Sequence, residues 1–194
     1  NGLIWMGDIE YMKAQIDEKL EKGFSCIKMK IGAIDFEEEY NLLTQIRRSY
    51  SKEQIELRVD ANGAFSSEEA LNFLQRLSEL DIHSIEQPIK QRQVAAMAEL
   101  CSKSPLAIAL DEELIGLKDH EAKRKLLDEI APQYIILKPA LLGGFKASDE
   151  WIALAEERSI GWWATSALES NIGLNAISQW LSLKQLSMPQ GLGT

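Results

Sequence analysis

The sequence contains little cysteine and little histidine, with two residues of each among 194. Cys26 and Cys101 lie far apart and form no CxxC motif, so we expect no disulfide framework and treat both as reduced packing residues. His83 and His120 match no motif, and we expect surface positions for both.

Long apolar runs are also missing. None approaches the roughly 20 residues that a helix needs to cross a bilayer. The first residues have neither the basic segment nor the apolar segment of a signal peptide. These two absences predict a cytoplasmic location.

Positive charge is in deficit, with 21 Lys and Arg against 30 Asp and Glu and a net charge of −9. Nucleic acids and anionic membrane surfaces attract basic patches, so this balance argues against both as partners. Most of the acidic runs fall in stretches with helical periodicity, where solvated helix faces explain them. The sequence leaves self-association open.

Short apolar runs alternate with longer amphipathic stretches along the whole sequence. The short runs predict β-strands and the amphipathic stretches predict helices. The predicted strands are Leu3–Met6, Cys26–Ile31, Glu56–Asp60, Ser84–Glu86, Leu106–Leu110, Tyr134–Lys138 and Gly161–Thr165. The predicted helices cover 8–22, a stripe from Phe36 to Ile46, 66–80, 93–102, 119–130, 148–158 and 171–183.

Seven strand–helix units with short apolar strands predict a parallel sheet covered by helices. Their spacing is close to the about 31 residues per unit of a (β/α)8 barrel. An open doubly wound sheet is the alternative, but no GxGxxG or GxxxxGK[ST] motif follows any strand. We therefore predict an α/β fold of the TIM-barrel type, with residues 1–194 as one domain. The sequence starts inside the first strand and stops where an eighth would begin, which predicts a partial barrel from a longer protein.

Charged side chains fall at the carboxyl ends of the predicted strands, where barrels of this type carry their active sites. In "CIKMKI" the alternation of side chains places Lys28 and Lys30 on one face and the apolar residues on the other. In a barrel the polar set faces the interior. The lysines then point toward the other strand ends, at Asp60, Glu86, Asp111, Lys138 and Ser166.

Three converging carboxylates without histidine or cysteine partners favour a hard divalent cation, Mg²⁺ or, as the alternative, Mn²⁺. The alternative is that Asp60, Glu86 and Asp111 only neutralise the lysines as buried ion pairs. Burying that many charges costs desolvation free energy, which argues against a purely structural role. A lysine beside a carboxylate substrate held by the cation could remove the proton α to that carboxylate. We therefore expect a small carboxylate as the partner.

The motifs "KMK", "DANG", "EQP", "LDE" and "LKP" resemble the enolase superfamily, and the two lysine-bearing strands resemble its muconate lactonizing enzyme subgroup. Within that subgroup, "ILKPALLGGF" and "SALESNIGLNAISQW" resemble the o-succinylbenzoate synthase family of menaquinone biosynthesis. This resemblance implies a lyase that dehydrates 2-succinyl-6-hydroxy-2,4-cyclohexadiene-1-carboxylate to 2-succinylbenzoate.

The resemblance also implies roles for individual residues. Lys30 would be the base and then the acid, Lys28 would tune it, and Lys138 would stabilise the anion from the opposite side. Mg²⁺ would be held by Asp60, Glu86 and Asp111. Substrate contacts would come from Arg58, Asn62, Ser166, Ser170 and Asn171.

The family also carries an N-terminal capping domain and a last strand that this sequence does not contain, so we expect these 194 residues alone to be weakly active or inactive. Three other functions stay open. One is a dipeptide epimerase or N-acylamino acid racemase of the same subgroup. The others are a class I aldolase, which the carboxylates and K-x-K pair fit poorly, and a barrel that binds a metal or an organic acid without catalysis.

Overall fold

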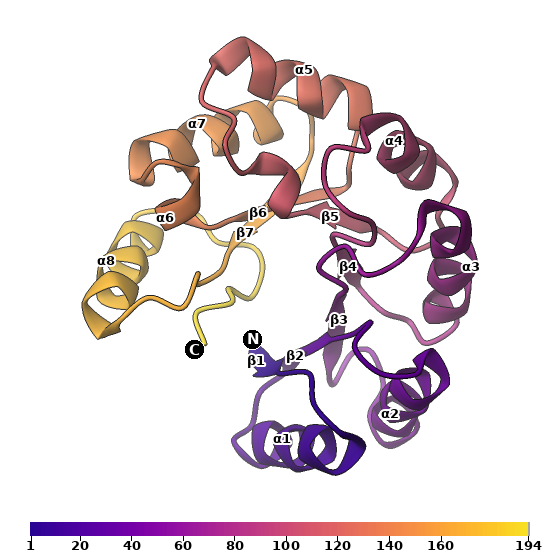
Figure 1. Cartoon of the computed structure of the whole chain (residues 1–194). Coiled ribbons are helices and arrows are strands. Elements are labelled where there is room, and N and C mark those ends of the chain that lie inside the picture. The colour runs from indigo at the N-terminus through magenta and orange to yellow at the C-terminus, as the bar shows by residue number, and fades with distance from the viewer. Residues whose placement is uncertain (194) are drawn as a thin grey trace.

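The computed structural model describes residues 1–193, which form a curved, all-parallel sheet with its helices on the outside (Figure 1). The seven strands pair in sequence order, from β1 to β7. Each strand is followed by at least one helix, as the βα alternation predicts. The strands are β1 (Gly2–Ile4), β2 (Cys26–Lys30), β3 (Glu56–Asp60), β4 (Ser84–Glu86), β5 (Ile108–Leu110), β6 (Tyr134–Leu137) and β7 (Gly161–Ala164).

The helices differ from the predicted ones mainly after β5 and β6. They are α1 (Ile9–Glu21), α2 (Phe36–Ser49), α3 (Ser67–Ser78), α4 (Val94–Lys103), the 3₁₀ turn η1 (Glu112–Leu114), α5 (His120–Ile130), α6 (Pro139–Leu142), α7 (Phe145–Glu156) and α8 (Asn171–Ser182). Neither η1 nor α6 was predicted, because both are single turns, and α7 starts at Phe145, before the predicted start at residue 148. Gly143 and Gly144, with φ of 101° and 92°, separate α6 from α7.

Local sequence signals explain the helix starts. Ser66 caps α3, since its Oγ accepts from the Glu69 N–H at 3.3 Å and donates to the Glu69 carboxylate at 2.8 Å. Asp8 caps α1 in a similar way, by accepting from the Tyr11 N–H. The amphipathic helices then turn their apolar faces to the sheet.

The main hydrophobic core lies between the sheet and the helices. In β2, Ile27 and Met29 are fully buried in this core. Lys28 and Lys30 lie on the other face, which is the concave side of the sheet. The predicted alternation in this strand is therefore confirmed.

A smaller apolar cluster lies apart from the main core and contains Ala109, Ile136 and Trp163. The Arg58 guanidinium lies 4.1 Å from the Trp163 ring centroid. His83, expected at the surface, is half-buried beside Tyr134, with ring centroids 5.0 Å apart. No helix among residues 1–193 is both long and apolar enough to cross a membrane.

The segment after α8 returns to the sheet. Gly191 forms a parallel bridge with Thr165, and its N–H donates to the Ala164 carbonyl at 2.8 Å. The amino group of Asn1 donates to the Gln190 carbonyl at 2.6 Å, so this segment lies between β7 and the N-terminus. Gly191 thus lies beside β7 at the point where the sequence predicts the start of an eighth strand.

Candidate active site

The three predicted carboxylates meet at one end of the sheet. Asp60 ends β3, Glu86 ends β4 in register with it, and Asp111 follows β5 directly. All three are buried, and one oxygen of each lies within 4.8 Å of the others. Strand register therefore assembles side chains from three separate βα units into one cluster.

The two lysines of β2 reach into this cluster. Lys28 Nζ donates to Glu86 Oε2 at 2.6 Å and to Asp60 Oδ2 at 3.2 Å. Lys30 Nζ donates to the same Asp60 oxygen at 2.6 Å and to Asn62 Oδ1 at 2.6 Å. The two ammonium groups thus share one carboxylate oxygen, which holds them side by side.

The third lysine comes from the opposite side. Lys138 follows β6 and donates to Asp111. Burial alone would lower the pKa of Lys138, but the Asp111 carboxylate outweighs it and the pKa is raised. Lys138 therefore lies across the cluster from Lys30 as a paired cation.

Burial and charge pull the carboxyl groups in different directions. Burial raises the pKa of Glu86 to about 8 and that of Asp111 to about 6. Burial also opposes the charge on Asp60, but Lys28 and Lys30 outweigh it and hold the pKa of Asp60 well below its usual range. The pKa of Lys28 is raised, because Glu86 and Asp60 more than offset its own burial.

The donor set of the cluster fits a divalent cation. All donors are carboxylate oxygens, the ligands that hard cations prefer. Hydrogen bonds from the lysines satisfy several of these oxygens, yet Glu86 Oε1 is buried and has no hydrogen-bond partner among the described residues. Ion pairing alone leaves this atom unexplained, since a buried carboxylate oxygen without a partner is costly. Asp60, Glu86 and Asp111 could therefore hold a metal ion.

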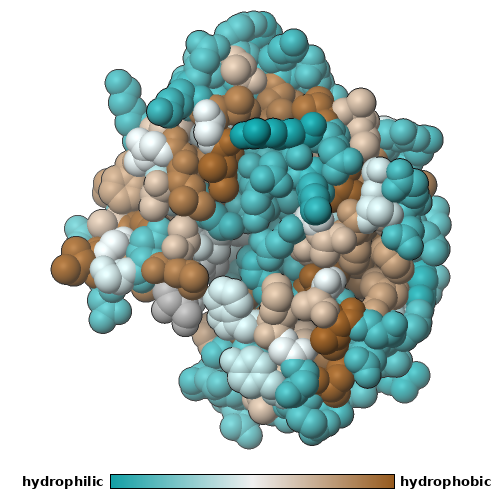
Figure 2. All heavy atoms as spheres, in the orientation of Figure 1, coloured by the Kyte–Doolittle hydropathy of each residue, from teal (hydrophilic) through white to brown (hydrophobic). Residues whose placement is uncertain are grey.

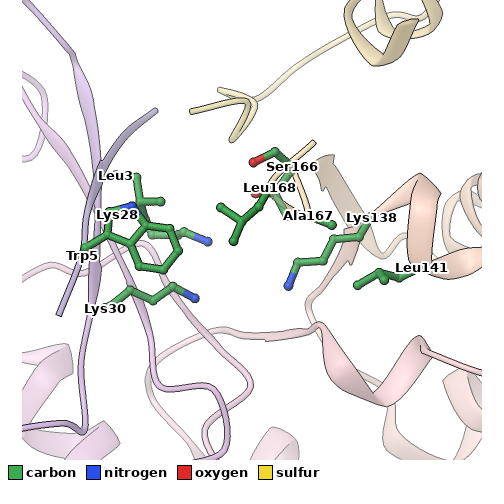
Figure 3. Close-up of a pocket in the computed structure, with 10 residues that line it drawn as sticks. Leu3, Trp5, Lys28, Lys30, Lys138, Leu141, Ser166, Ala167 and Leu168 are labelled. Atoms are coloured by element: carbon green, nitrogen blue, oxygen red, sulfur yellow. The ribbon is translucent and has the colours of Figure 1, made fainter. Parts of the chain in front are cut away.

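A cavity of about 240 Å³ opens beside the lysines. Figure 3 shows Lys28 and Lys30 entering it from one side and Lys138 from the other, with their ammonium groups pointing toward each other. The centroid of the Trp5 ring lies 5.9 Å from Lys30 Nζ. In Figure 2, hydrophilic residues gather in the middle of the face in view. The remaining lining residues are Leu3, Leu141, Thr165, Ser166, Ala167 and Leu168.

The five predicted substrate contacts divide into two groups. Ser166 lines the cavity, and Asn62 contacts Lys30. Arg58 is fully buried and donates to the Pro189 carbonyl at 3.1 Å, while its guanidinium pairs with Glu56. Arg58 is not among the residues that line the cavity, and neither are two exposed residues at the start of α8, Ser170 and Asn171.

Apolar lining residues were missed by the sequence analysis. Leu168 is 64% exposed, has a φ of +63° and lies in the loop after β7, and Leu141 is also exposed. Each lies four residues after the end of a strand, Leu141 after β6 and Leu168 after β7, and a large apolar residue at that position is the sequence signal that could have identified them. Their side chains give the cavity an apolar wall beside its charged one.

The chain is similar to an o-succinylbenzoate synthase from Desulfotalea psychrophila, with 62% identity over 194 residues, which are 100% of this chain and 52% of that protein. It is also similar to the crystal structure of MenC from Desulfotalea psychrophila, with a TM-score of 0.92 and 60% identity over 100% of this chain and 53% of that one. An N-succinylamino acid racemase from Thermus thermophilus is 34% identical over 158 residues, 81% of this chain and 40% of that protein.

The chain therefore spans about half the length of the first two proteins, or less in the third case. A family model described as "Enolase C-terminal domain-like" matches residues 11–189. That match covers most of the chain, including all three carboxylates and all three lysines of the cluster. The resemblance found in the motifs is confirmed, and the chain belongs to the enolase C-terminal domain-like family.

Proposed function

We propose that residues 1–194 form one barrel domain of an o-succinylbenzoate synthase. In the full-length protein this domain would be a (β/α)8 barrel, completed by the strand that starts near Gly191 and covered by a capping domain. The observation that carries the proposal is the placement of Lys30 and Lys138 on opposite sides of one cavity, each paired with a carboxylate of the same cluster. The 62% identity to a protein of that name supports it.

The substrate would be 2-succinyl-6-hydroxy-2,4-cyclohexadiene-1-carboxylate and the product 2-succinylbenzoate. Asp60, Glu86 and Asp111 would hold Mg²⁺, or Mn²⁺ in its place. When bound, the cation supplies positive charge that stabilises the substrate carboxylate as its α-proton leaves. It would also compete with the lysines for the carboxylates of the cluster.

Lys30 is the proposed base. As the free amine, it takes the proton α to the ring carboxylate, and the electron pair left behind forms an ene-diolate with that carboxylate. The resulting ammonium then gives a proton to the hydroxyl group on the same face, so that water leaves and the ring becomes aromatic. Asn62 Oδ1, 2.6 Å from Lys30 Nζ, holds the amine in place.

The other two lysines would act through their charge. Lys138 points into the cavity from the far side and would stabilise the negative charge that develops on the substrate carboxylate. Lys28 shares an oxygen of Asp60 with Lys30, which keeps a positive charge next to the base. Both therefore favour the anion that forms during proton removal.

The test uses the full-length protein and follows turnover of the cyclohexadiene acid by ultraviolet absorbance, with Mg²⁺ or with chelator. Wild type should turn over only with Mg²⁺. Lys30→Ala should lose several orders of magnitude, since a positioned base alone supplies about 10²–10⁴-fold. The matched control is Lys123→Ala, because Lys123 is as buried but pairs with Glu150 among the outer helices. If Lys123→Ala loses as much activity as Lys30→Ala, or the wild type binds Mg²⁺ without turnover, the proposal fails.

A second candidate function is racemisation or epimerisation of N-acylamino acids or dipeptides. Two lysines on opposite faces suit removal of a proton from one face and its return on the other, and one relative is named an N-succinylamino acid racemase. NMR can follow the exchange of the α-proton of an N-succinylamino acid with deuterium from solvent. This measurement separates the two candidate functions. If this second function is present, Lys138→Ala should abolish exchange of the α-proton for one of the two enantiomers. If it is absent, Lys138→Ala should have no such effect.

A further inference from the structure

The loops that follow β3, β4 and β5 meet at one buried residue, Gln87. It comes directly after Glu86 and is 0% exposed. Its φ of +38° lies in the left-handed region, which is unusual for a residue with a side chain. Such a strained backbone conformation persists where surrounding contacts hold the residue in place.

All four hydrogen-bonding positions of the Gln87 amide are used. Its Oε1 accepts from the N–H of Asp111 at 3.1 Å and from that of Glu113 at 3.4 Å. Its Nε2 donates to the Ile89 carbonyl at 3.0 Å and to Glu113 Oε2 at 3.3 Å. Only a primary amide offers two donors and two acceptor positions in this shape. The side chain therefore ties the loop after β4 to the loop after β5.

The main chain of Gln87 makes the remaining connections. Its N–H donates to the Ala109 carbonyl in β5 at 2.9 Å, and its carbonyl accepts from the Gly63 N–H, in the loop after β3, at 2.7 Å. The other oxygen of Glu113 accepts from the Arg92 N–H at 2.7 Å. One residue is thus bonded to each of the three segments that carry a carboxylate of the cluster.

We propose that Gln87 is a positioning residue that sets the spacing of Asp60, Glu86 and Asp111 for a cation of the size of Mg²⁺. This inference rests on the metal site of the proposed function. Mg²⁺ demands near-ideal octahedral geometry at about 2.0–2.1 Å, whereas Ca²⁺ accepts irregular geometry and longer distances. A clamp that fixes the carboxylates should therefore matter more for Mg²⁺ than for Ca²⁺.

The experiment measures Mn²⁺ binding to the full-length protein by electron paramagnetic resonance, with Mg²⁺ and Ca²⁺ measured by competition. Gln87→Met keeps the length of the side chain and removes all four hydrogen bonds. Loss of a partner that orients a metal ligand typically weakens metal binding by about 10–100-fold. We expect that loss for Mn²⁺ and Mg²⁺, together with a smaller loss for Ca²⁺.

The matched control is Gln133→Met. The Gln133 Oε1 also accepts a backbone N–H of β5, that of Ile108 at 2.9 Å, but at the opposite end of the strand. This variant should change thermal stability without changing the affinity for Mn²⁺ or the preference for Mg²⁺ over Ca²⁺.

A milder variant covers the case in which Gln87→Met does not fold. Glu113→Gln keeps one of the two bonds that the Glu113 carboxylate accepts and gives up the other. This variant should weaken the binding of Mg²⁺ more than the binding of Ca²⁺, whereas a purely electrostatic effect would weaken the binding of both ions equally. The inference is overturned if Gln87→Met and Glu113→Gln both keep the wild-type preference for Mg²⁺ over Ca²⁺. It is also overturned if Gln133→Met loses as much metal affinity as Gln87→Met. A wild type that binds no Mn²⁺ overturns the metal site itself and the clamp with it.

Discussion

Replacing Lys28 by Met should reveal how strongly the carboxylate cluster depends on its cations. Lys28 is 4% exposed and pairs with Asp60 and Glu86, both of which are 0% exposed. Asp60 keeps Lys30 as a partner, so the carboxylate left alone is that of Glu86. Breaking a buried pair by removing one partner costs about 3–5 kcal/mol, because the remaining charge stays desolvated.

The sign of the pH dependence follows from Glu86. Burial raises its pKa to about 8, so below that pH the carboxyl group can bind a proton and lose its charge. The cost of Lys28→Met should therefore be smallest near pH 6 and reach about 3–5 kcal/mol above pH 8. The measurement is urea denaturation of the full-length protein in chelator, followed by circular dichroism at both pH values.

Two variants make this test decisive. Lys123→Met removes a lysine that is 1% exposed but whose partner Glu150 keeps 33% of its side-chain surface exposed, so the loss should be smaller. The double variant Lys28→Met with Glu86→Gln removes both charges and should recover most of the stability. If Lys28→Met and Lys123→Met cost the same at every pH, the reasoning about the cluster is wrong.

Three further predictions concern groups near the cluster. In the metal-free wild type, native Glu86 keeps a proton that the unfolded chain releases near its ordinary pKa of 4.5. The free energy of unfolding should therefore fall as pH rises from about 5 to 8. Calorimetry should show that the affinity for Mg²⁺ rises over the same pH range. Glu39→Ala should cost about 2–3 kcal/mol in urea denaturation, because the buried carboxylate accepts from the Gly32 N–H at 2.8 Å and from that of Ala33 at 3.2 Å; an unchanged midpoint would contradict this. Asn62→Ala should lower kcat about 10–100-fold with little change in KM if Asn62 holds Lys30, whereas a raised KM with unchanged kcat would indicate direct contact with the substrate.

The repeated βα units and the faces of their strands could be predicted from the sequence. Both depend on short-range patterns, an alternation of two residues in strands and of about 3.6 in helices. In β2 that alternation correctly placed Lys28 and Lys30 opposite Ile27 and Met29. The carboxylates could be placed together because the ends of parallel strands meet at one edge of a sheet.

The alternation of residues along a strand predicts which face of the sheet a side chain lies on. It does not predict how deep within the barrel that side chain lies. Arg58 shares a face with Asp60, yet it contacts Trp163 and the Pro189 carbonyl instead of the cavity. Ser170 and Asn171 are close in sequence to Ser166, but the start of α8 carries them away from the lining. Depth depends on the stagger between strands, which local sequence does not encode.

Which residue types stand at each strand end follows from the amino-acid sequence alone, because the chemistry and spacing of "KMK", "DANG", "EQP" and "LDE" are local. How those strand ends are held together depends on contacts that form only in the folded chain. The sharing of Asp60 by two lysines and the pairing of Lys138 with Asp111 join residues from different βα units, and so do three of the four side-chain bonds of Gln87. Such contacts depend on register and loop geometry across the sheet, and these are set only when the whole chain has packed.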